Sequence, residues 1–227
     1  MAAHCSCCGV DGAPFLLCPI DIPGVEVRPI TTLTGDAEFC EVFFTDARIP
    51  IENVVGEVNG GWAVATSLLG LERGEEAATN PIFFSAELDR IVLLAREKGL
   101  SGDPVVRDRL AWCYTKVETM RFLGYRILTQ VLREGTIGPE SSIAKLYWSE
   151  YHQQATDLAM QLLGADALVR NGRRPNKHFR TDEPGADNTS NSWIDVTLLN
   201  ARSGTVYAGT SEIQRNIIAE NILGLPK

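Results

Sequence analysis

The segment "PVVRDRLAWCYTKVETMRFLGYRILTQVLR" (residues 104–133) carries a helical pattern of apolar residues over its whole length. Apolar side chains recur every three or four residues, and this spacing places them on one face of an α-helix. They are Leu110, Tyr114, Val117, Met120, Leu123, Ile127 and Val131. A long helix of this kind is stable when its apolar face packs against other helices, so the segment favours a helical bundle.

Further helical segments lie on either side of this one. We predict helices at residues 62–75 and 82–98, separated by a kink or a restart at Pro81, and we expect Gly99 to cap the second. Residues 139–168 and a short C-terminal helix complete an up-and-down bundle, so the chain is predicted to be mainly α. The apolar repeat in residues 139–168 consists of Ile143, Leu146, Tyr147, Leu158 and Leu162.

The N-terminal part of the chain has a strand-like pattern instead. The stretch "VEVRPI" alternates apolar and polar residues, and Cys40, Val42 and Phe44 alternate in the same way. A few short strands do not form an independent sheet. We therefore predict that residues 1–57 are the remnant of a larger β domain, followed by the helical bundle domain at residues 58–227.

The composition of the 227 residues limits the class of function. The formal net charge of −8 argues against a nucleic-acid partner. No apolar run approaches the roughly 20 residues of a membrane-spanning helix, and the N-terminus lacks the features of a secretory signal. Four of the six cysteines crowd into the first 18 residues, so we expect reduced thiols in a cytoplasmic protein rather than a disulfide framework.

The stretch "HCSCCG" (residues 4–9) raises the question of a metal site. A structural zinc ion needs about four ligands at suitable spacing. A second cysteine pair is missing, and His4, His152 and His178 lie far apart in the sequence. We therefore expect no metal site.

The C-terminal stretch "VYAGTSEIQRNIIAENILG" (residues 206–224) places small residues directly before a helix. Ser211 and Gln214 have the spacing of a capping box, Ser-x-x-Gln. A helix N-terminus presents free N–H groups and a positive dipole end, which suit a phosphate or an electron-rich carbonyl oxygen. The alternative is an ordinary capped helix after a tight turn.

In this C-terminal region the chain resembles the acyl-CoA dehydrogenases. "YAGTSEIQRNIIAENILGLPK" is similar to the C-terminal signature of that family. Upstream, "GVEVRPI", "EVFFTDARIPIENVVGEVNGGW" and "LERG" stand in the family's order, and "MQLLG" resembles its flavin-binding Gln-x-x-Gly-Gly segment. The resemblance implies the C-terminal helical domain and the end of the middle β domain. The family's N-terminal helical domain and the first half of its β domain have no counterpart in this sequence.

The resemblance also implies an activity, the FAD-dependent α,β-dehydrogenation of an acyl-CoA thioester to the 2-enoyl-CoA. The α-carbon loses a proton as a hydride leaves the β-carbon for the flavin, so the site needs a polarised thioester carbonyl and a carboxylate base. The partners that it implies are the acyl-CoA substrate, an electron-transfer flavoprotein and further subunits in a homo- or hetero-oligomer.

The family's Tyr-Glu-Gly-Thr motif, which supplies the base in medium-chain enzymes, has Ala208 in place of its glutamate. Isovaleryl-CoA and long-chain dehydrogenases place a glutamate before an arginine on the first helix of this domain. Resemblance to them implies that Glu72 in "GLERG" is the base, while the Ala208 backbone N–H still polarises the thioester carbonyl. The alternative is that Glu72 is a surface residue and the chain lacks a base.

The remaining site residues also follow from the resemblance. Arg73 matches an arginine that contacts the CoA moiety. Thr210 and Glu212 match positions on the flavin, and Gln161 and Gly164 match the flavin segment contributed across a subunit interface. Two alternatives to an active enzyme stay open: a non-catalytic subunit that completes the flavin site of a heteromeric acyl-CoA dehydrogenase, or an incomplete, inactive chain.

Overall fold

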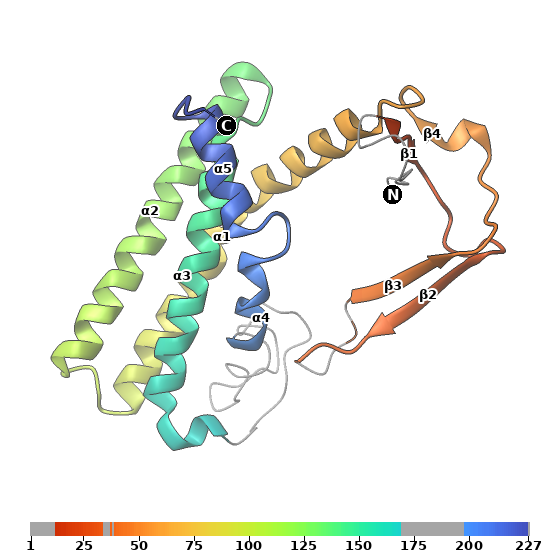
Figure 1. Ribbon diagram of the computed structural model, residues 1–227. Coiled ribbons are helices and arrows are strands. Elements are labelled where there is room, and N and C mark those ends of the chain that lie inside the picture. The colour runs from red at the N-terminus through yellow and green to blue at the C-terminus, as the bar shows by residue number, and fades with distance from the viewer. Residues whose placement is uncertain (1–11, 34–36, 38, 169–197, 227) are drawn as a thin grey trace. The chain divides into compact units, whose positions relative to one another are not determined.

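The computed structural model describes residues 12–33, 37, 39–168 and 198–226, without the side chains of residues 72–76. The "HCSCCG" stretch lies outside the described residues. The contacts divide the chain into two compact units, Met1–Leu71 and Glu72–Lys227. Each unit is described by itself below, and the elements are labelled in Figure 1.

The first unit contains two small antiparallel sheets. In one, β1 (Phe15–Leu16) pairs with β4 (Val54–Val55); in the other, β2 (Val25–Ile30) pairs with β3 (Phe39–Phe44). A short 3-10 helix, η2 (Ile51–Asn53), precedes β4.

Both strand-like stretches of the sequence therefore form strands, and they pair with each other from Val25 opposite Phe44 to Ile30 opposite Phe39. The hairpin leaves large apolar side chains exposed, including Val27, Phe39 and Phe44. An isolated two-stranded hairpin is marginally stable in water, so these strands need additional contacts to be stable.

Three long helices dominate the second unit, which confirms the predicted mainly α bundle (Figure 1). They are α1 (Gly61–Glu97), which begins in the first unit, α2 (Pro104–Glu134) and α3 (Glu140–Leu163). The helix η3 (Gly164–Leu168) continues α3 as a 3-10 turn, so the predicted 139–168 helix is α-helical only as far as Leu163. After the undescribed stretch come α4 (Leu199–Ala201), η5 (Ser203–Thr205) and α5 (Ser211–Asn221).

Local signals at both ends account for the bounds of α2. The Asp103 carboxylate accepts hydrogen bonds from the N–H groups of Val105 (2.8 Å) and Val106 (3.1 Å), as an N-cap residue does. Gly135 ends the helix with a left-handed φ of 71°, which costs glycine little.

The predicted restart of the helix at Pro81 is wrong, because α1 continues through this residue. Proline has no N–H to bond the carbonyl four residues earlier, which here belongs to Ala77. That carbonyl lies against the backbone of Gly124 in α2, where an added Cβ would come within 2.6 Å of the oxygen. Burial of Ala77 and Phe84 on either side of Pro81 stabilises the continuous helix.

The core of the second unit lies between α1, α2 and α3. Its buried members include Phe84 and Ile91 of α1, Val117 of α2, and Trp148 and Leu158 of α3. In α2 the buried face is close to the predicted one, although Tyr114 is exposed.

In α3 the predicted apolar face is only partly correct. Leu158 and Leu162 are buried, whereas Ile143, Leu146 and Tyr147 are only half-buried. The N-terminal half of α3 buries a mixture of aromatic, small and polar side chains instead: Ser141, Ser142, Ala144, Lys145, Trp148, Ser149, Tyr151 and His152. Polar groups inside a bundle need hydrogen-bond partners, and the candidate site supplies some of them.

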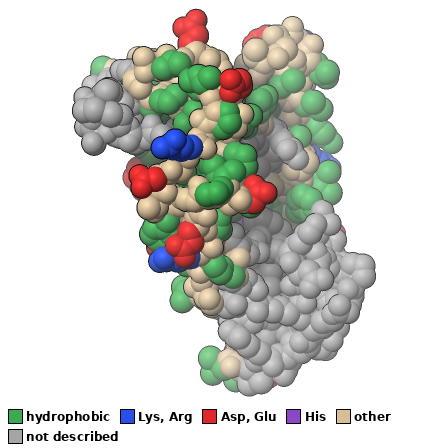
Figure 2. Space-filling view, turned by 90° about the vertical axis from the view of Figure 1, so that its right-hand side faces the viewer, with side chains coloured by type: hydrophobic (Ala, Val, Ile, Leu, Met, Phe, Trp, Pro, Cys, Tyr) green, Lys and Arg blue, Asp and Glu red, His purple; other side chains and the backbone are tan. Residues whose placement is uncertain are grey.

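Many large apolar side chains remain at the surface. On α2 these include Phe122, Tyr125 and Leu132, and Ile82 lies exposed on α1. In the space-filling view, hydrophobic side chains lie exposed between scattered charged ones (Figure 2). No helix in the described ranges is long and apolar enough to cross a membrane.

Candidate active site

The segment before α5 makes a tight turn with two successive left-handed residues. The φ angle is 52° at Ala208 and 91° at Gly209. The left-handed region is unfavourable for alanine, and such a conformation persists where surrounding contacts hold it. An added Cβ at Gly209 would collide with the Gln214 side-chain amide, so only glycine fits there without rearrangement.

Gln214 and Lys145 provide the contacts that hold this turn. The Gln214 Nε2 donates to the carbonyl oxygens of Ala208 (3.0 Å) and Gly209 (3.3 Å). The Lys145 Nζ, from α3, donates to the carbonyl oxygens of Gly209 and Gly204, both at 2.7 Å. Both side chains are 1% exposed, so these bonds form away from water.

The predicted capping box at the start of α5 is wrong. The N-cap is Thr210, whose Oγ1 accepts a hydrogen bond from the Ile213 N–H at 3.2 Å. Ser211 is therefore the first helical residue, and its buried hydroxyl has no hydrogen-bond partner in the described part of the chain. Because Thr210 already caps the helix, the Gln214 amide is free to turn back and bind the Ala208–Gly209 turn.

The turn presents backbone donors next to the N-terminus of α5. Among the described residues, the N–H groups of Ala208, Gly209 and Thr210 have no hydrogen-bond partner. All three residues are half-buried, so a ligand atom can reach them. Donors at a helix N-terminus suit a carbonyl oxygen or an anion.

Glu212 is exposed in the first turn of α5. Its pKa is lowered by a hydrogen bond from its own backbone N–H and by another from the Thr210 hydroxyl, with a smaller contribution from Arg215. The carboxylate is therefore ionised at neutral pH and acts only as an acceptor. It can accept an N–H from a ligand, and it disfavours a phosphate at the same place.

Gln161 and Gly164 lie at the other end of α3. The Gln161 side-chain carbonyl accepts a hydrogen bond from the Arg109 guanidinium of α2. Gly164 ends α3 with a φ of 61°, and a Cβ added there would meet no atom within 4 Å. This end of the helix therefore combines an open backbone position with a half-buried cation.

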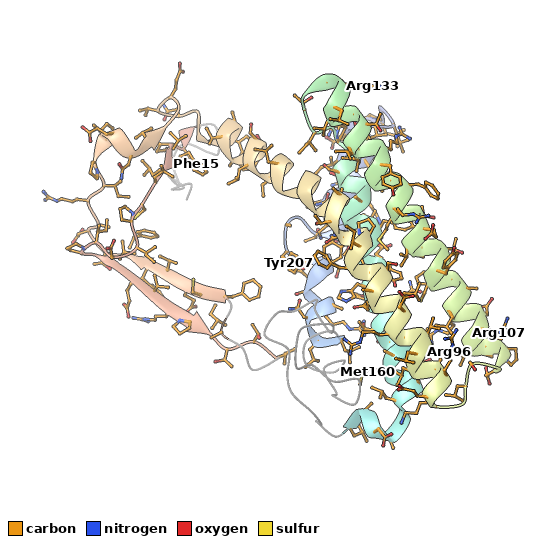
Figure 3. The ribbon with its side chains drawn as sticks, turned by 180° about the vertical axis from the view of Figure 1, so that it is seen from behind. Phe15, Arg96, Arg107, Arg133, Met160 and Tyr207 are labelled. Carbon is orange, nitrogen blue, oxygen red and sulfur yellow. The ribbon has the colours of Figure 1, made fainter. Side chains whose placement is uncertain are left out.

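Within one chain, the Ala208–Thr210 turn and residues 161–164 do not lie next to each other. Gln161 lies sixteen positions after Lys145, which holds the turn, along α3. At 1.5 Å per residue they lie about 24 Å apart along the helix axis. Figure 3 labels Met160, next to Gln161, and Tyr207, next to Ala208, at different places in the second unit.

The two charged residues of the "GLERG" stretch are described only by their backbones. The backbones of Glu72 and Arg73 lie in α1, and their side chains lie outside what the structure describes. No group of three or more potential ligands that could hold a metal ion occurs in the described ranges.

The residues present fit the polar parts of a flavin nucleotide. Unpartnered N–H groups at Ala208–Thr210 suit ring carbonyl oxygens, and the Glu212 carboxylate suits a ring N–H. Arg109 supplies the kind of cation that a pyrophosphate binds. Arg109 lies against Gln161 near the end of α3, whereas the Ala208–Thr210 turn is bound by Lys145 near its beginning.

Sequence reasoning missed the roles of Lys145 and Gln214. A signal was present in both cases. Lys145 lies three residues before Trp148 and seven before His152, which puts this cation on a face that also carries aromatic residues. Gln214 lies one position after the true N3 residue, Ile213, so a cap at Thr210 frees it for another role.

The family model of the acyl-CoA dehydrogenase C-terminal domain matches residues 59–223. This range covers the helical bundle and the Ala208–Gly209 turn. The chain therefore belongs to the acyl-CoA dehydrogenase family, whose members are flavoproteins.

A curated relative is the acyl-CoA dehydrogenase IpdE1 of Mycobacterium tuberculosis, which is 38% identical over 216 residues. The match covers 95% of this chain and 51% of the relative, so the chain spans about half the length of the curated relatives it matches. IpdE1 of Mycolicibacterium smegmatis is also 38% identical, over 95% of this chain and 50% of its own length.

Solved structures have the same fold. The Tcur3481–Tcur3483 steroid ACAD aligns with a TM-score of 0.79 and 28% identity, over 96% of this chain and 53% of that one. The ChsE4–ChsE5 complex from Mycobacterium tuberculosis aligns with a TM-score of 0.77 and 25% identity, over 100% of this chain and 57% of that one.

Proposed function

We propose that this chain supplies the carbonyl-polarising part of an FAD-dependent site for α,β-dehydrogenation of an acyl-CoA to the 2-enoyl-CoA. The observation that carries the proposal is the Ala208 N–H, which has no hydrogen-bond partner in the described residues. It lies in a turn whose carbonyl oxygens accept hydrogen bonds from the Gln214 and Lys145 side chains. A donor that is already oriented towards a developing negative charge lowers the barrier to its formation.

In this mechanism the thioester carbonyl oxygen accepts a hydrogen bond from the Ala208 N–H. Polarisation of that carbonyl makes the α-proton more acidic, and Glu72 removes the proton as general base. Arg73 would bind the CoA moiety, and Thr210, Glu212, Gln161 and Gly164 would hold the flavin. Bound FAD would supply the acceptor for the hydride that leaves the β-carbon, and an electron-transfer flavoprotein would take up the electrons.

The separation of the two half-sites favours an assembly of more than one chain. Residues 161–164 of one subunit and residues 208–212 of another would border the same flavin, because about 24 Å of helix keeps them apart within one chain. The exposed apolar residues of α2 and of the β2–β3 hairpin are consistent with further subunit contacts.

A second candidate function is that of a non-catalytic subunit that completes the flavin site of a longer partner. The observation that favours it is the similarity to the Tcur3481–Tcur3483 and ChsE4–ChsE5 structures, each named for two different chains. The steroid ACAD among them also favours a bulky, ring-containing acyl group as the substrate class.

Absorption spectroscopy and turnover separate these candidates. The full chain is purified alone and after co-expression with a second acyl-CoA dehydrogenase chain, and butyryl-CoA, octanoyl-CoA and a steroid side-chain acyl-CoA are supplied with an artificial electron acceptor. A flavin content near one per chain, measured from the absorption bands, together with turnover supports the enzyme. Flavin with turnover that survives Glu72→Gln supports the non-catalytic subunit, and colourless protein in both preparations contradicts both candidates.

A further inference from the structure

Lys145 is a cation-bearing side chain that is buried in the second unit. It lies in the second turn of α3 and is 1% exposed. Burial of an amine is unfavourable unless its N–H groups find acceptors. Its Nζ reaches the carbonyl oxygens of Gly204 and Gly209, each at 2.7 Å, and so joins α3 to the segment that precedes α5.

The same segment is held on α3 by packing next to Lys145. The Tyr207 ring lies 6.4 Å from the Trp148 ring, and the Lys145 Nζ lies 5.9 Å from the centre of the Tyr207 ring. Gly204 packs so closely on Trp148 that an added Cβ would lie 3.1 Å from the indole. The position of residues 204–209 is therefore set by two successive turns of α3.

The carbonyl contacts also determine the directions of the N–H groups. In a trans peptide the C=O and the following N–H point in opposite directions. Lys145 and Gln214 bind the Gly209 oxygen, so the Thr210 N–H points away from both side chains. Gln214 binds the Ala208 oxygen, so the Gly209 N–H points away from Gln214.

We propose that Lys145 is a positioning residue for the reaction: by binding the carbonyl oxygens of Gly204 and Gly209, it orients the Ala208–Thr210 N–H groups towards the substrate and the flavin. The inference rests on the function proposed above. Lys145 touches neither ligand and acts through the turn. Without it, the Gly209 oxygen keeps only its 3.3 Å hydrogen bond from Gln214, so the left-handed turn relaxes towards more favourable backbone angles.

The first test measures the conformation of the turn directly and does not depend on activity. The full chain, in the assembly in which it purifies, is labelled with ¹⁵N-alanine, glycine and threonine, and its amide spectra are compared between the parent and Lys145→Met. Methionine has a similar length and is apolar, so it removes the two hydrogen bonds with little change in volume. The proposal expects the Ala208, Gly209 and Thr210 amide signals to shift or broaden. Unchanged signals would overturn it.

The second test separates positioning from stability. The control is Lys98→Met, which makes the same substitution at a partly exposed lysine paired with Asp166. In the flavin-loaded assembly, Lys145→Met is expected to lower kcat by about 10- to 100-fold, with KM changed by less than about threefold, because the donors are misaligned in the transition state. Lys98→Met is expected to retain parent kinetics. A loss of folded protein with unchanged kcat in the remaining fraction would mean that Lys145 is only structural.

The two tests distinguish a failure of the positioning role of Lys145 from a failure of the proposed dehydrogenation. If the turn signals move in Lys145→Met but the parent turns over no acyl-CoA, the positioning role stands and the proposed reaction does not. If Lys145→Met does not fold by circular dichroism, Lys145→Arg replaces it in both tests, because the longer side chain keeps its charge and donors but cannot reproduce both 2.7 Å contacts. Parent signals and parent kinetics in Lys145→Arg would then overturn the proposal.

Discussion

Glu87 and His152 form a buried pair between α1 and α3, with 3.0 Å between Oε2 of the glutamate and Nε2 of the histidine. Their side chains are 2% and 0% exposed. The Phe84 ring covers the pair, with 5.1 Å between its centre and that of the imidazole. A polar pair in so apolar a setting links the two helices at one register, and removal of either partner breaks this contact inside the core.

The first prediction concerns this pair. Glu87→Leu and His152→Leu are each expected to lower the free energy of unfolding by about 3–5 kcal/mol. The double variant should lose less than the sum of the two, by about 1–3 kcal/mol, because the two side chains contact each other and each single change already breaks that contact. Urea denaturation at neutral pH measures all three. As control, Glu150→Leu breaks the exposed pair with Arg215 and should cost less than about 1 kcal/mol. Strict additivity at Glu87 and His152 would contradict the coupling.

The second prediction concerns the thiol of Cys113, which is buried beside Tyr151 and Glu87. Burial raises the pKa of Cys113 to about 12, partly offset by Arg109 and reinforced by Glu87. The thiolate is the reactive form, so iodoacetamide at a mildly alkaline pH should modify exposed Cys40 and leave Cys113 intact in the folded chain. Peptide mass spectrometry measures both sites, and equal modification would contradict the burial of Cys113.

The same pKa predicts a loss of stability at high pH. The thiol has an ordinary pKa of 9.0 in the unfolded chain and about 12 in the folded one. Between these values only the unfolded state releases the proton, so the free energy of unfolding falls as pH rises, by at most about 1.4 kcal/mol per pH unit for one proton. Cys113→Ala should reduce that slope and leave a residual one, because burial also raises the pKa of Tyr151. Identical slopes would contradict the prediction.

The third prediction tests which residue caps α5. Thr210→Ala removes the acceptor of the Ile213 N–H and should destabilise the chain by about 1 kcal/mol. Ser211→Ala removes a hydroxyl that has no partner among the described residues, so it should be neutral or slightly stabilising. Thermal unfolding of the two variants gives the comparison, and a larger loss for Ser211→Ala would restore the capping box read from the sequence.

The fourth prediction separates backbone strain from collision at Gly209. Gly99→Ala places alanine at a φ of 69° in open space and should cost about 1 kcal/mol. Gly209→Ala carries the same conformational cost at a φ of 91°, and its Cβ also displaces the Gln214 amide from the turn. We expect a further loss of at least about 1 kcal/mol, together with reduced flavin content. Equal losses at the two glycines would show that Gln214 moves aside without cost.

The fifth prediction concerns the base. In the flavin-loaded assembly, Glu72→Gln keeps the shape of the side chain and removes its basicity, so kcat should fall by at least about 100-fold. Binding of acyl-CoA should change little, because binding does not require proton transfer. Glu97→Gln, at the exposed C-terminal end of the same helix, is the matched control. Parent turnover in Glu72→Gln would assign the base elsewhere.

Several parts of the fold were readable from the sequence because local interactions decide them. Asp103, Pro104 and Gly135 mark the ends of α2, and every signal involved lies within a few residues of the helix terminus. The β2 and β3 strands likewise follow from alternation along the chain. The resemblance at residues 206–224 led to the family, since those residues carry its signature.

Other features depend on contacts between residues far apart in the sequence. Pro81 is locally a helix breaker, yet α1 continues because Ala77 and Phe84 are buried and the Ala77 carbonyl, to which Pro81 cannot donate, lies against Gly124. The cap of α5 was misassigned for a similar reason. Thr210 and Ser211 are both good N-cap residues, and the burial of Gln214 against the preceding turn selects Thr210.

By itself, the sequence determined the class of fold, the helix-forming segments and the family, because periodicity, end signals and a contiguous signature are properties of neighbouring residues. Only the tertiary structure decided that Lys145 is buried on two carbonyl oxygens, that Glu87 meets His152, and that the Ala208–Gly209 turn is bound near the beginning of α3, far along the helix from Gln161. These relationships join residues 59 to 65 positions apart, or depend on the rigid length of α3. Such distances arise only when the helices pack, and no local pattern encodes them.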